Sequence, residues 1–294
     1  MSTTPAGHVA RSTVRPNSET SRRTPLRTFL HTDDGVTIDS VYDPGRAVYD
    51  ASAPPAVDLV FVVAHGFTGD VDRPHVRRVV EAFTQYGAVV TFSFRGHGAS
   101  GGRSTVGDKE VLDLAAAVRW ARSLGHTRVA TVGFSMGGSV VLRHAALYGT
   151  DGGRHEGKRE GRTEAATDAV VSVSAPARWY YRGTAPMRKL HWLVTRPEGR
   201  LVGRHVFRTR IHHREWDPVP LSPVEAVPGI APTPLLIVHG DRDGYFPVDH
   251  PRMLAAAAGD HGELWLEGGM GHAEHAATDD LLARIGDWAV ARAG

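Results

Sequence analysis

The sequence of 294 residues contains no cysteine, which excludes disulfide bonds, thiolate zinc sites and a thiol nucleophile. Lysine is almost as rare, since only three of the 34 basic residues are lysine and the rest are arginine. Such a bias lowers the weight of any single arginine as a functional signal. Because the chain has no cysteine thiol, its chemistry is expected to use oxygen and nitrogen groups.

Long hydrophobic runs are absent as well. No stretch approaches the ~20 apolar residues that span a membrane, and the N-terminus lacks the ~7–15-residue apolar segment of a secretory signal. We therefore expect a cytoplasmic protein without stable membrane insertion. Hydrophobic residues still make up 41% of the chain, which is enough for a sizeable core in one large or two small domains.

The charge is unevenly distributed, although its formal sum is only +2. Residues 1–27 hold five arginines and one glutamate, and residues 176–216 hold nine arginines and one lysine against two glutamates. No nucleic-acid motif accompanies these basic segments, so nucleic-acid binding is not expected. The second segment has two interpretations: it favours an anionic or phosphate-bearing substrate or an interface, or it is a solvated arginine-rich face.

The chain divides into a tail, a core and an insertion. Residues 1–25 are rich in Ser, Thr, Pro and Arg, which predicts a disordered basic tail. From residue 26 short apolar runs alternate with amphipathic stretches, which is typical of an α/β protein with a mostly parallel sheet. Strands are predicted at 37–42, 58–64, 88–94, 129–134, 169–174, 234–239 and 263–266, and helices at 74–86, 107–124, 136–148, 249–258 and 279–291.

Two segments interrupt this alternation. Residues 149–167 are glycine-rich and charged, which predicts an exposed loop. Residues 176–227 are basic, interrupted by proline and contain several Trp and Tyr residues. This segment is too short for an independent domain, so it is predicted to be a cap or lid on a core formed by residues 26–175 and 228–294.

A G-x-S-x-G motif occupies residues 133–137, between the predicted strand 129–134 and the predicted helix 136–148. So tight a turn leaves no room for side chains beside the serine, and it projects the Ser135 hydroxyl from the sheet with a helix N-terminus behind it. The alternative is a phosphate-binding turn, but no G-x-G-x-x-G or lysine-bearing loop surrounds it. Ser135 is therefore a candidate nucleophile.

A serine nucleophile needs a base that accepts its proton, and the base needs a carboxylate that orients it. Asp241 and Asp243 lie in the loop after the predicted strand 234–239. His272 lies in the glycine-rich loop after the predicted strand 263–266. The chain therefore offers a base and two candidate acids at strand ends, in the order Ser, Asp, His.

Two further motifs precede the serine: H-G-F-T-G at residues 65–69 and R-G-H-G-A-S at residues 95–100. Together with the Ser, Asp and His loops, they make the chain from about residue 26 to 291 resemble an α/β-hydrolase. It is most similar to the serine hydrolases that include monoacylglycerol lipases, acyl esterases and proline-aminopeptidase-like enzymes. The resemblance implies a mostly parallel eight-stranded sheet flanked by helices, with a short cap.

Applied to this chain, the family pattern makes Ser135 the nucleophile, His272 the base and Asp243 the orienting acid. Asp241 is close enough to compete for the last role. The oxyanion hole would use the backbone amides of Phe67 and Met136.

The resemblance also assigns roles that are not catalytic. The family uses histidines at the positions of His65 and His97 to hold backbone rather than to transfer protons. It often has aspartate where this chain has Ser93, a difference that concerns loop anchoring more than catalysis. His275 follows His272 at H-x-x-H spacing, which fits one triad and one solvent-exposed histidine better than a metal site. No metal and no cofactor are expected.

The family builds its lid from the segment that corresponds to the predicted cap. Trp179, Tyr180, Met187 and Trp192 are therefore candidates for an apolar wall of the substrate pocket. Aromatic residues at such spacing also pack against the body of a protein, and the sequence leaves both interpretations open.

The resulting hypothesis is a serine hydrolase that cleaves a carboxylic ester of a small-molecule substrate through an acyl-enzyme. Thioesterase, lysophospholipase or monoacylglycerol lipase, aminopeptidase and carbon–carbon bond hydrolase activities use the same triad and remain open. A non-enzyme alternative is a ligand-binding receptor on this fold, which the complete set of three residues disfavours. The sequence gives no prediction of oligomeric state.

Overall fold

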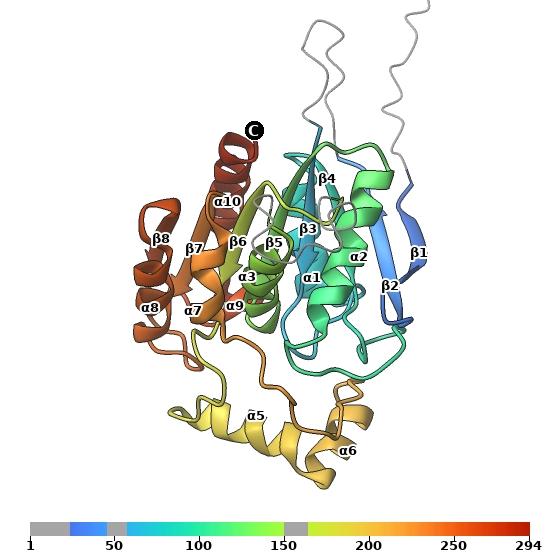
Figure 1. Ribbon diagram of the computed structural model, residues 1–294, viewed down its shortest axis with the longest axis vertical. Helices are drawn as coiled ribbons and strands as arrows, with labels where there is room; N and C mark the ends of the chain where they lie inside the picture. Colours follow the sequence, from blue (N-terminus) through green and yellow to red (C-terminus); the bar gives the residue numbers. More distant parts are fainter. Residues whose placement is uncertain (1–23, 46–57, 150–163) are drawn as a thin grey trace, which may run out of the picture.

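The computed structural model describes residues 24–45, 58–149 and 164–294, so almost all of the predicted tail lies outside the described residues. The described residues contain one sheet of eight strands, flanked by helices (Figure 1). The strands are β1 (Leu26–His31), β2 (Thr37–Asp43), β3 (Leu59–Ala64), β4 (Ala88–Phe92), β5 (Arg128–Phe134), β6 (Ala169–Val173), β7 (Leu235–Gly240) and β8 (Gly262–Glu267).

The strands are ordered β1-β2-β4-β3-β5-β6-β7-β8 in the sheet. The β1–β2 and β2–β4 pairs are antiparallel, and every pair from β4 to β8 is parallel. This confirms the predicted mostly parallel, eight-stranded sheet. From β3 the chain continues to β4 on one side and to β5 on the other side of β3 in the sheet. Ala64 at the end of β3 pairs with Gly133 in β5, so the loops that follow these two strands start side by side.

The central strands are buried on both faces, which explains their continuous apolar sequences. In β3 alternate residues enter opposite layers: Val60 and Val62 face one core cluster, whereas Phe61 and Val63 face the other. Helices α2 (Glu110–Ser123), α3 (Met136–Tyr148) and α8 (Asp249–Ala258) cover the first cluster, and helices α1 (Pro74–Phe83) and α10 (Asp279–Arg292) cover the second. The molecule is thus a three-layer α/β sandwich, as Figure 1 shows.

The helices follow the strands in the alternation that the sequence predicts. They are α1 (Pro74–Phe83), α2 (Glu110–Ser123), α3 (Met136–Tyr148), α5 (Ala185–Thr195), α6 (Pro197–His205), α7 (Pro223–Ala226), α8 (Asp249–Ala258), α9 (Ala273–Ala276) and α10 (Asp279–Arg292). Two short 3₁₀ turns are η1 (Val227–Ile230) and η2 (Gly259–His261).

Several boundaries differ from the predicted ones. Helix α2 begins three residues later than predicted, because the Glu110 carboxylate accepts the amides of Thr105 and Gly107 and holds that segment as a loop. Of the predicted exposed loop 149–167, residues 150–163 lie outside the described residues, and the prediction is wrong at its end. Ala165 and Thr167 are buried, and the Thr167 hydroxyl donates to the Val129 carbonyl (3.1 Å).

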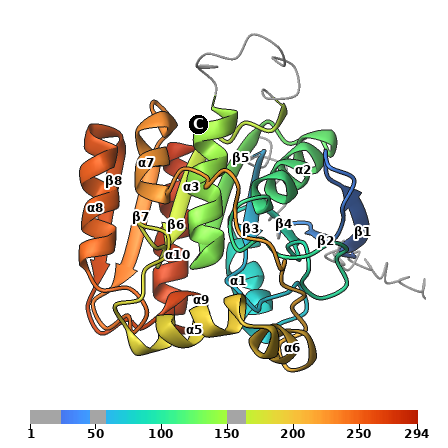
Figure 2. The ribbon, with the colours of Figure 1, turned by 60° about the horizontal axis from the view of Figure 1, so that its bottom comes forward.

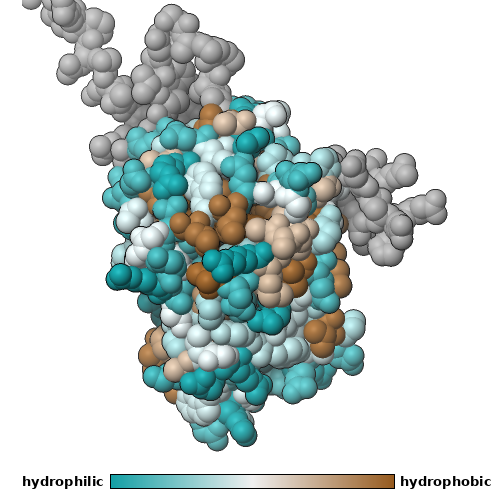
Figure 3. Space-filling view, turned by 90° about the vertical axis from the view of Figure 1, so that its left-hand side faces the viewer, coloured by the Kyte–Doolittle hydropathy of each residue, from teal (hydrophilic) through white to brown (hydrophobic). Residues whose placement is uncertain are grey.

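Strand β8 forms the second edge of the sheet, on the side of the molecule that Figure 3 shows. Its residues are mostly half-buried, Leu266 is 42% exposed, and apolar surface gathers midway down this face (Figure 3). The Arg284 guanidinium lies 4.8 Å from the centre of the Trp265 ring, so a charge covers part of the edge. Within the described residues no helix has the length and apolarity to span a bilayer.

The residues between β6 and β7 carry α5 and α6, which lie beyond one end of the sheet (Figures 1 and 2). The Thr184 hydroxyl, at the start of α5, donates to the Tyr245 carbonyl in the loop after β7 (2.9 Å). After α6, Thr209 pairs with His97 and Ile211 with Ser104. Both ends of this segment are therefore held on loops of the core.

Core packing resumes before the predicted end of the cap at residue 227. Ala226 and Val227, in α7 and η1, are 3% and 0% exposed. Val227 belongs to the same apolar cluster as α3 and α8. In the structure the segment beyond the end of the sheet therefore ends near α7.

Candidate active site

Ser135 lies in the turn between β5 and α3, in a conformation that is rare for a residue with a side chain. Its φ is 52° and its ψ is −112°. The Ser135 amide donates to the Val173 carbonyl at the end of β6 (2.8 Å), which fixes the turn on the neighbouring strand. The turn places the serine directly before the N-terminus of α3.

Two glycines permit this turn. A Cβ atom on Gly133 would collide with the Gly137 carbonyl, and a Cβ atom on Gly137 would collide with the Ala64 carbonyl of β3. The absence of both side chains lets β3, β5 and α3 approach one another. The spacing of the G-x-S-x-G motif is therefore a packing requirement of the turn that presents Ser135.

The His272 ring lies between Ser135 and Asp243. Its Nε2 atom is 2.9 Å from the Ser135 hydroxyl, and its Nδ1 atom is 2.7 Å from Oδ2 of Asp243. Because the carboxylate accepts the Nδ1 proton, the Nε2 lone pair faces the hydroxyl. The structure thus brings together the three side chains that the loops after β5, β7 and β8 were predicted to supply.

The Asp243 side chain is fully buried. Its Oδ1 atom accepts the amides of Tyr245 (2.8 Å) and Phe246 (3.1 Å). Burial alone raises the pKa of a carboxyl, but the hydrogen bond and charge of His272 and the two amides hold the pKa of Asp243 below its ordinary value. Asp243 is therefore a carboxylate at neutral pH.

Asp241, the competing candidate, points elsewhere. Its Oδ1 atom accepts the Gly269 amide (2.7 Å), and its side chain is exposed. This bond joins the loop after β7 to the loop that carries His272. Asp241 therefore supports the histidine loop and makes no contact with the ring.

The Tyr245 ring packs on His272, a contact that the sequence analysis did not identify. The two ring centres are 4.2 Å apart with an angle of 26° between the planes. The carbonyl of Tyr245 also accepts the Thr184 hydroxyl at the start of α5. One residue therefore touches the histidine and holds the segment that carries α5. The sequence offers only its position two residues after Asp243 as a signal.

The two predicted oxyanion donors come from adjacent loops. Met136 is the first residue of α3, so its amide has no partner within the helix. Phe67 follows β3, which lies next to β5 in the sheet. The two residues thus lie in a helix N-terminus and in the loop after the neighbouring strand, and their role as oxyanion donors stays a prediction.

His65 and His97 lie beneath this loop. His65 Nε2 accepts the Phe94 amide (3.0 Å), so its Nδ1 donates to the Gly66 carbonyl (2.7 Å). Burial lowers the pKa of His65 to about 3, so the ring is neutral. The His97 ring packs edge-on against Phe67 at 5.7 Å. Both histidines hold backbone or side chains of the loop and contact neither Ser135 nor His272.

Glu274 is a buried carboxylate that the sequence analysis did not identify. It is 4% exposed, and it accepts the amide of Gly66 at 3.1 Å. It lies two residues after His272, and Gly66 lies directly before Phe67. The contact therefore joins the histidine loop to the predicted oxyanion loop. Glutamate is usually exposed, and no residue pattern around position 274 signals its burial.

The four residues predicted for the substrate pocket take different positions. Met187 is 8% exposed, whereas Tyr180 and Trp192 are 56% and 48% exposed. The Trp179 indole donates to the Pro220 carbonyl (3.0 Å) and packs on the Trp216 ring at 5.1 Å. These contacts show packing within the segment itself, so a substrate wall of these four residues stays a prediction.

No group of three or more histidine or acidic side chains suited to a metal occurs in the parts of the chain that the structure describes.

The fully buried histidines, three of which are His65, His97 and His144, predict a loss of stability in mild acid. Burial lowers the pKa of His65 and His144 to about 3 and that of His97 to about 4. In the unfolded chain each titrates near 6.5, so below that pH the unfolded state binds more protons. Each histidine then costs about 1.4 kcal/mol per pH unit, or about 4 kcal/mol for the three, until the folded state is protonated as well.

Urea unfolding at pH 7.5, 6 and 5 measures this loss. The His144→Leu variant is the matched test, because neither ring nitrogen of His144 has a hydrogen-bond partner among the described residues. We expect the pH dependence of the variant to be shallower by about 1.4 kcal/mol per pH unit. An identical slope in both proteins would contradict the assignment to buried histidines.

The comparisons with known proteins identify the family and the fold. The sequence model of the α/β-hydrolase family matches residues 59–285. The Pyrococcus furiosus esterase Pf2001 is 22% identical and has a TM-score of 0.66 over 92% of this chain and 94% of its own. The α/β-hydrolase GrgF from Penicillium sp. sh18 is 17% identical, with a TM-score of 0.65 over 92% and 99%. No curated protein matches significantly in sequence.

A further solved structure is Est1E from Butyrivibrio proteoclasticus with bound ferulic acid. It is 19% identical, with a TM-score of 0.54 over 90% of this chain and 96% of its own. At these identities the solved structures establish the fold. The fold and the turn at Ser135 define an α/β-hydrolase architecture. The family match extends over most of the chain, from β3 into α10, and the protein therefore belongs to the α/β-hydrolase family.

Proposed function

We propose that this protein is a serine hydrolase that cleaves a carboxylic ester through an acyl-enzyme intermediate. The observation that carries the proposal is the continuous set of hydrogen bonds from Ser135 through His272 to Asp243. The strained serine turn and the ionised, buried carboxylate support the same conclusion. The Pyrococcus furiosus esterase among the structural relatives favours an ester as the substrate.

In the proposed reaction the Ser135 Oγ attacks the ester carbonyl while His272 Nε2 takes its proton. The amides of Phe67 and Met136 stabilise the negative oxygen of the tetrahedral intermediate. His272 then gives the proton to the leaving alcohol, and the acyl group remains on Ser135. Water repeats these steps with the same base and releases the acid and the free hydroxyl. Asp243 keeps the imidazole in the correct tautomer and stabilises its positive charge throughout.

Labelling with a fluorophosphonate tests the nucleophile. This reagent traps a serine that is activated by a base, so we expect one label on the peptide that contains Ser135. Ser135→Ala should remain unlabelled and should lose turnover of p-nitrophenyl esters of any chain length. Ser123→Ala is the matched control, because Ser123 lies at the exposed end of α2, and its label should equal that of the wild type. Absence of both label and turnover in the wild type would overturn the proposal.

A further inference from the structure

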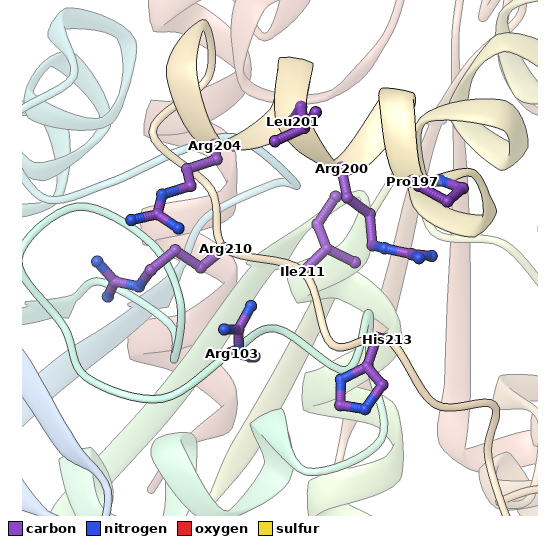
Figure 4. Close-up of a pocket in the computed structure, with 8 residues that line it drawn as sticks. All are labelled: Arg103, Pro197, Arg200, Leu201, Arg204, Arg210, Ile211 and His213. Carbon is purple, nitrogen blue, oxygen red and sulfur yellow. The ribbon is translucent and has the colours of Figure 1, made fainter.

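An arginine-lined cavity of about 310 Å³ lies between α6 and the loops of the core. It is lined by Arg103, Pro197, Arg200, Leu201, Arg204, Arg210, Ile211 and His213 (Figure 4). Four of these eight residues carry a guanidinium group, and none carries a carboxylate. We refer to these eight residues as the arginine pocket.

Two chain segments fixed to each other build the arginine pocket. Arg200 and Arg204 are four residues apart on α6 and therefore share a helix face. Arg210 follows α6, and its backbone pairs with the R-G-H-G-A-S loop: its amide donates to the Gly96 carbonyl (2.7 Å), and its carbonyl accepts the Ser104 amide (2.8 Å). Arg103 lies directly before Ser104. In Figure 4 Arg204 and Arg210 extend to the same side of the cavity near Arg103, and the Arg200 guanidinium points to the opposite side, toward Pro197.

The positive charge of the pocket is not balanced by the protein. In the ranges that the structure describes, none of the four arginines forms an ion pair with a carboxylate. Arg200 donates to the Thr195 carbonyl (2.8 Å) and Arg210 to the carbonyls of Ser100 and Gly102. Arg103 and Arg204 are exposed, and their guanidinium groups donate to no acceptor among the described residues. Two guanidinium groups are therefore fixed by neutral acceptors, and two are free to bind a ligand.

The positive charges of the arginine pocket lie close enough to repel one another. Burial lowers the pKa of Arg210, and the positive charges of Arg204 and Arg103 lower it further. Such repulsion costs stability in the free protein and is relieved by a bound anion. Glu198, the nearest acidic residue on α6, does not line the cavity. An anion is therefore the complementary ligand.

We propose that the arginine pocket binds a phosphate group and thereby recognises the phosphorylated end of the ester substrate. A phosphate monoester offers three terminal oxygens to several guanidinium forks, whereas a carboxylate offers two. The cavity is at the small end of the usual range for ligand pockets, which suits a phosphate with a short polar group. The ester bond would be cleaved at Ser135, and the phosphate would stay intact on the leaving alcohol.

The pocket is connected to the candidate active site through the loop that it contacts. Arg210 pairs with Gly96, the next residue is His97, and the His97 ring packs edge-on on Phe67. Phe67 is a predicted oxyanion donor. The backbone of Arg210 is therefore linked to the predicted oxyanion loop through Gly96 and His97. This role in substrate recognition rests on the proposed hydrolase function, but phosphate binding itself does not.

Calorimetric titration of the full chain with inorganic phosphate tests the binding site directly. We expect saturable binding that weakens about tenfold or more in Arg103→Gln and in Arg204→Gln. Arg252→Gln removes the same charge from an exposed arginine on α8 and should bind phosphate as the wild type does. Equal losses in all three variants, or no binding by the wild type, would overturn the proposal.

Turnover of a matched substrate pair tests recognition. Monobutyrylglycerol and its 3-phosphate differ only in the phosphate, so the ratio of their kcat/KM values isolates its effect. We expect a ratio above one that falls about tenfold in Arg204→Gln and stays unchanged in Arg252→Gln. A wild-type ratio of one or less would overturn this role. Failure of the hydrolase proposal differs, since neither ester would then be cleaved.

Sedimentation with vesicles distinguishes a lipid phosphate from a soluble phosphate ester as the ligand. Wild type and Arg204→Gln are sedimented with phosphatidylcholine vesicles, with and without phosphatidic acid. Binding only to the vesicles with phosphatidic acid, lost in the variant, supports a lipid phosphate as the ligand. Phosphate binding in calorimetry without vesicle binding supports a soluble phosphate ester. A protein that binds neither probe refutes the phosphate site.

Discussion

His272→Ala is expected to lower kcat for ester hydrolysis by about 10⁵–10⁶-fold, with little change in KM. The Ser135 hydroxyl has one basic nitrogen within hydrogen-bond distance among its described contacts, Nε2 of His272 at 2.9 Å. Without it, no group takes the serine proton during attack or returns a proton to the leaving alcohol. Stopped assays with the best p-nitrophenyl ester at high enzyme concentration measure the residual rate.

Two further variants test whether the loss of activity is due to the action of His272 on Ser135. His272→Ala combined with Ser135→Ala should be no slower than either single variant, because the two residues act as one unit. His275→Ala is the matched control, since the His275 ring packs on His75 with ring centres 4.0 Å apart. It should retain kcat within a few-fold of the wild type. A large loss in His275→Ala, or substantial activity in His272→Ala, would contradict the assignment of the base.

Prediction from the sequence succeeded where a local structure can be formed by only a few residue types. The turn at Ser135 needs glycines at 133 and 137 because backbone carbonyls lie where their side chains would be. That requirement is local, so a motif of five residues predicts it. The central strands were predicted for a similar reason, since burial on both faces demands a continuous apolar run. Strand β1 is exposed on alternate residues and carries no such signal.

Contacts between distant segments could not be predicted in this way. Glu274 is buried because the Gly66 amide, 208 residues earlier, needs an acceptor there. The position of α6 depends on the pairing of Thr209 and Ile211 with a loop more than 100 residues earlier. Trp192, on the preceding helix α5, is 48% exposed, and its helical spacing gives no indication of this. Such contacts depend on tertiary packing, which overrides local pattern.

The choice between Asp241 and Asp243 illustrates the limit within the site itself. The two residues lie in one loop, and both have a carboxylate. The turn after β7 sends Asp243 inward to His272 and Asp241 outward to Gly269. The two aspartates have the same charge and lie in the same stretch of sequence. Only the path of the backbone therefore distinguishes their roles.

Asp243→Asn is expected to lower kcat by about 10⁴-fold while the protein stays folded. The asparagine carbonyl can still accept the amides of Tyr245 and Phe246. Its NH₂ group, however, would donate to His272 Nδ1 and shift the ring proton to Nε2. The ring would then present a proton to Ser135 instead of the lone pair that accepts one.

Asp241→Asn provides the comparison, because it makes the same chemical change two residues away. Its carbonyl can keep the bond from the Gly269 amide, so kcat should stay within a few-fold of the wild type. Thermal unfolding of both variants separates lost activity from lost structure. A 10⁴-fold loss in Asp241→Asn with an active Asp243→Asn would assign the acid to Asp241 instead. Equal and small losses in both would show that the histidine acts without either carboxylate.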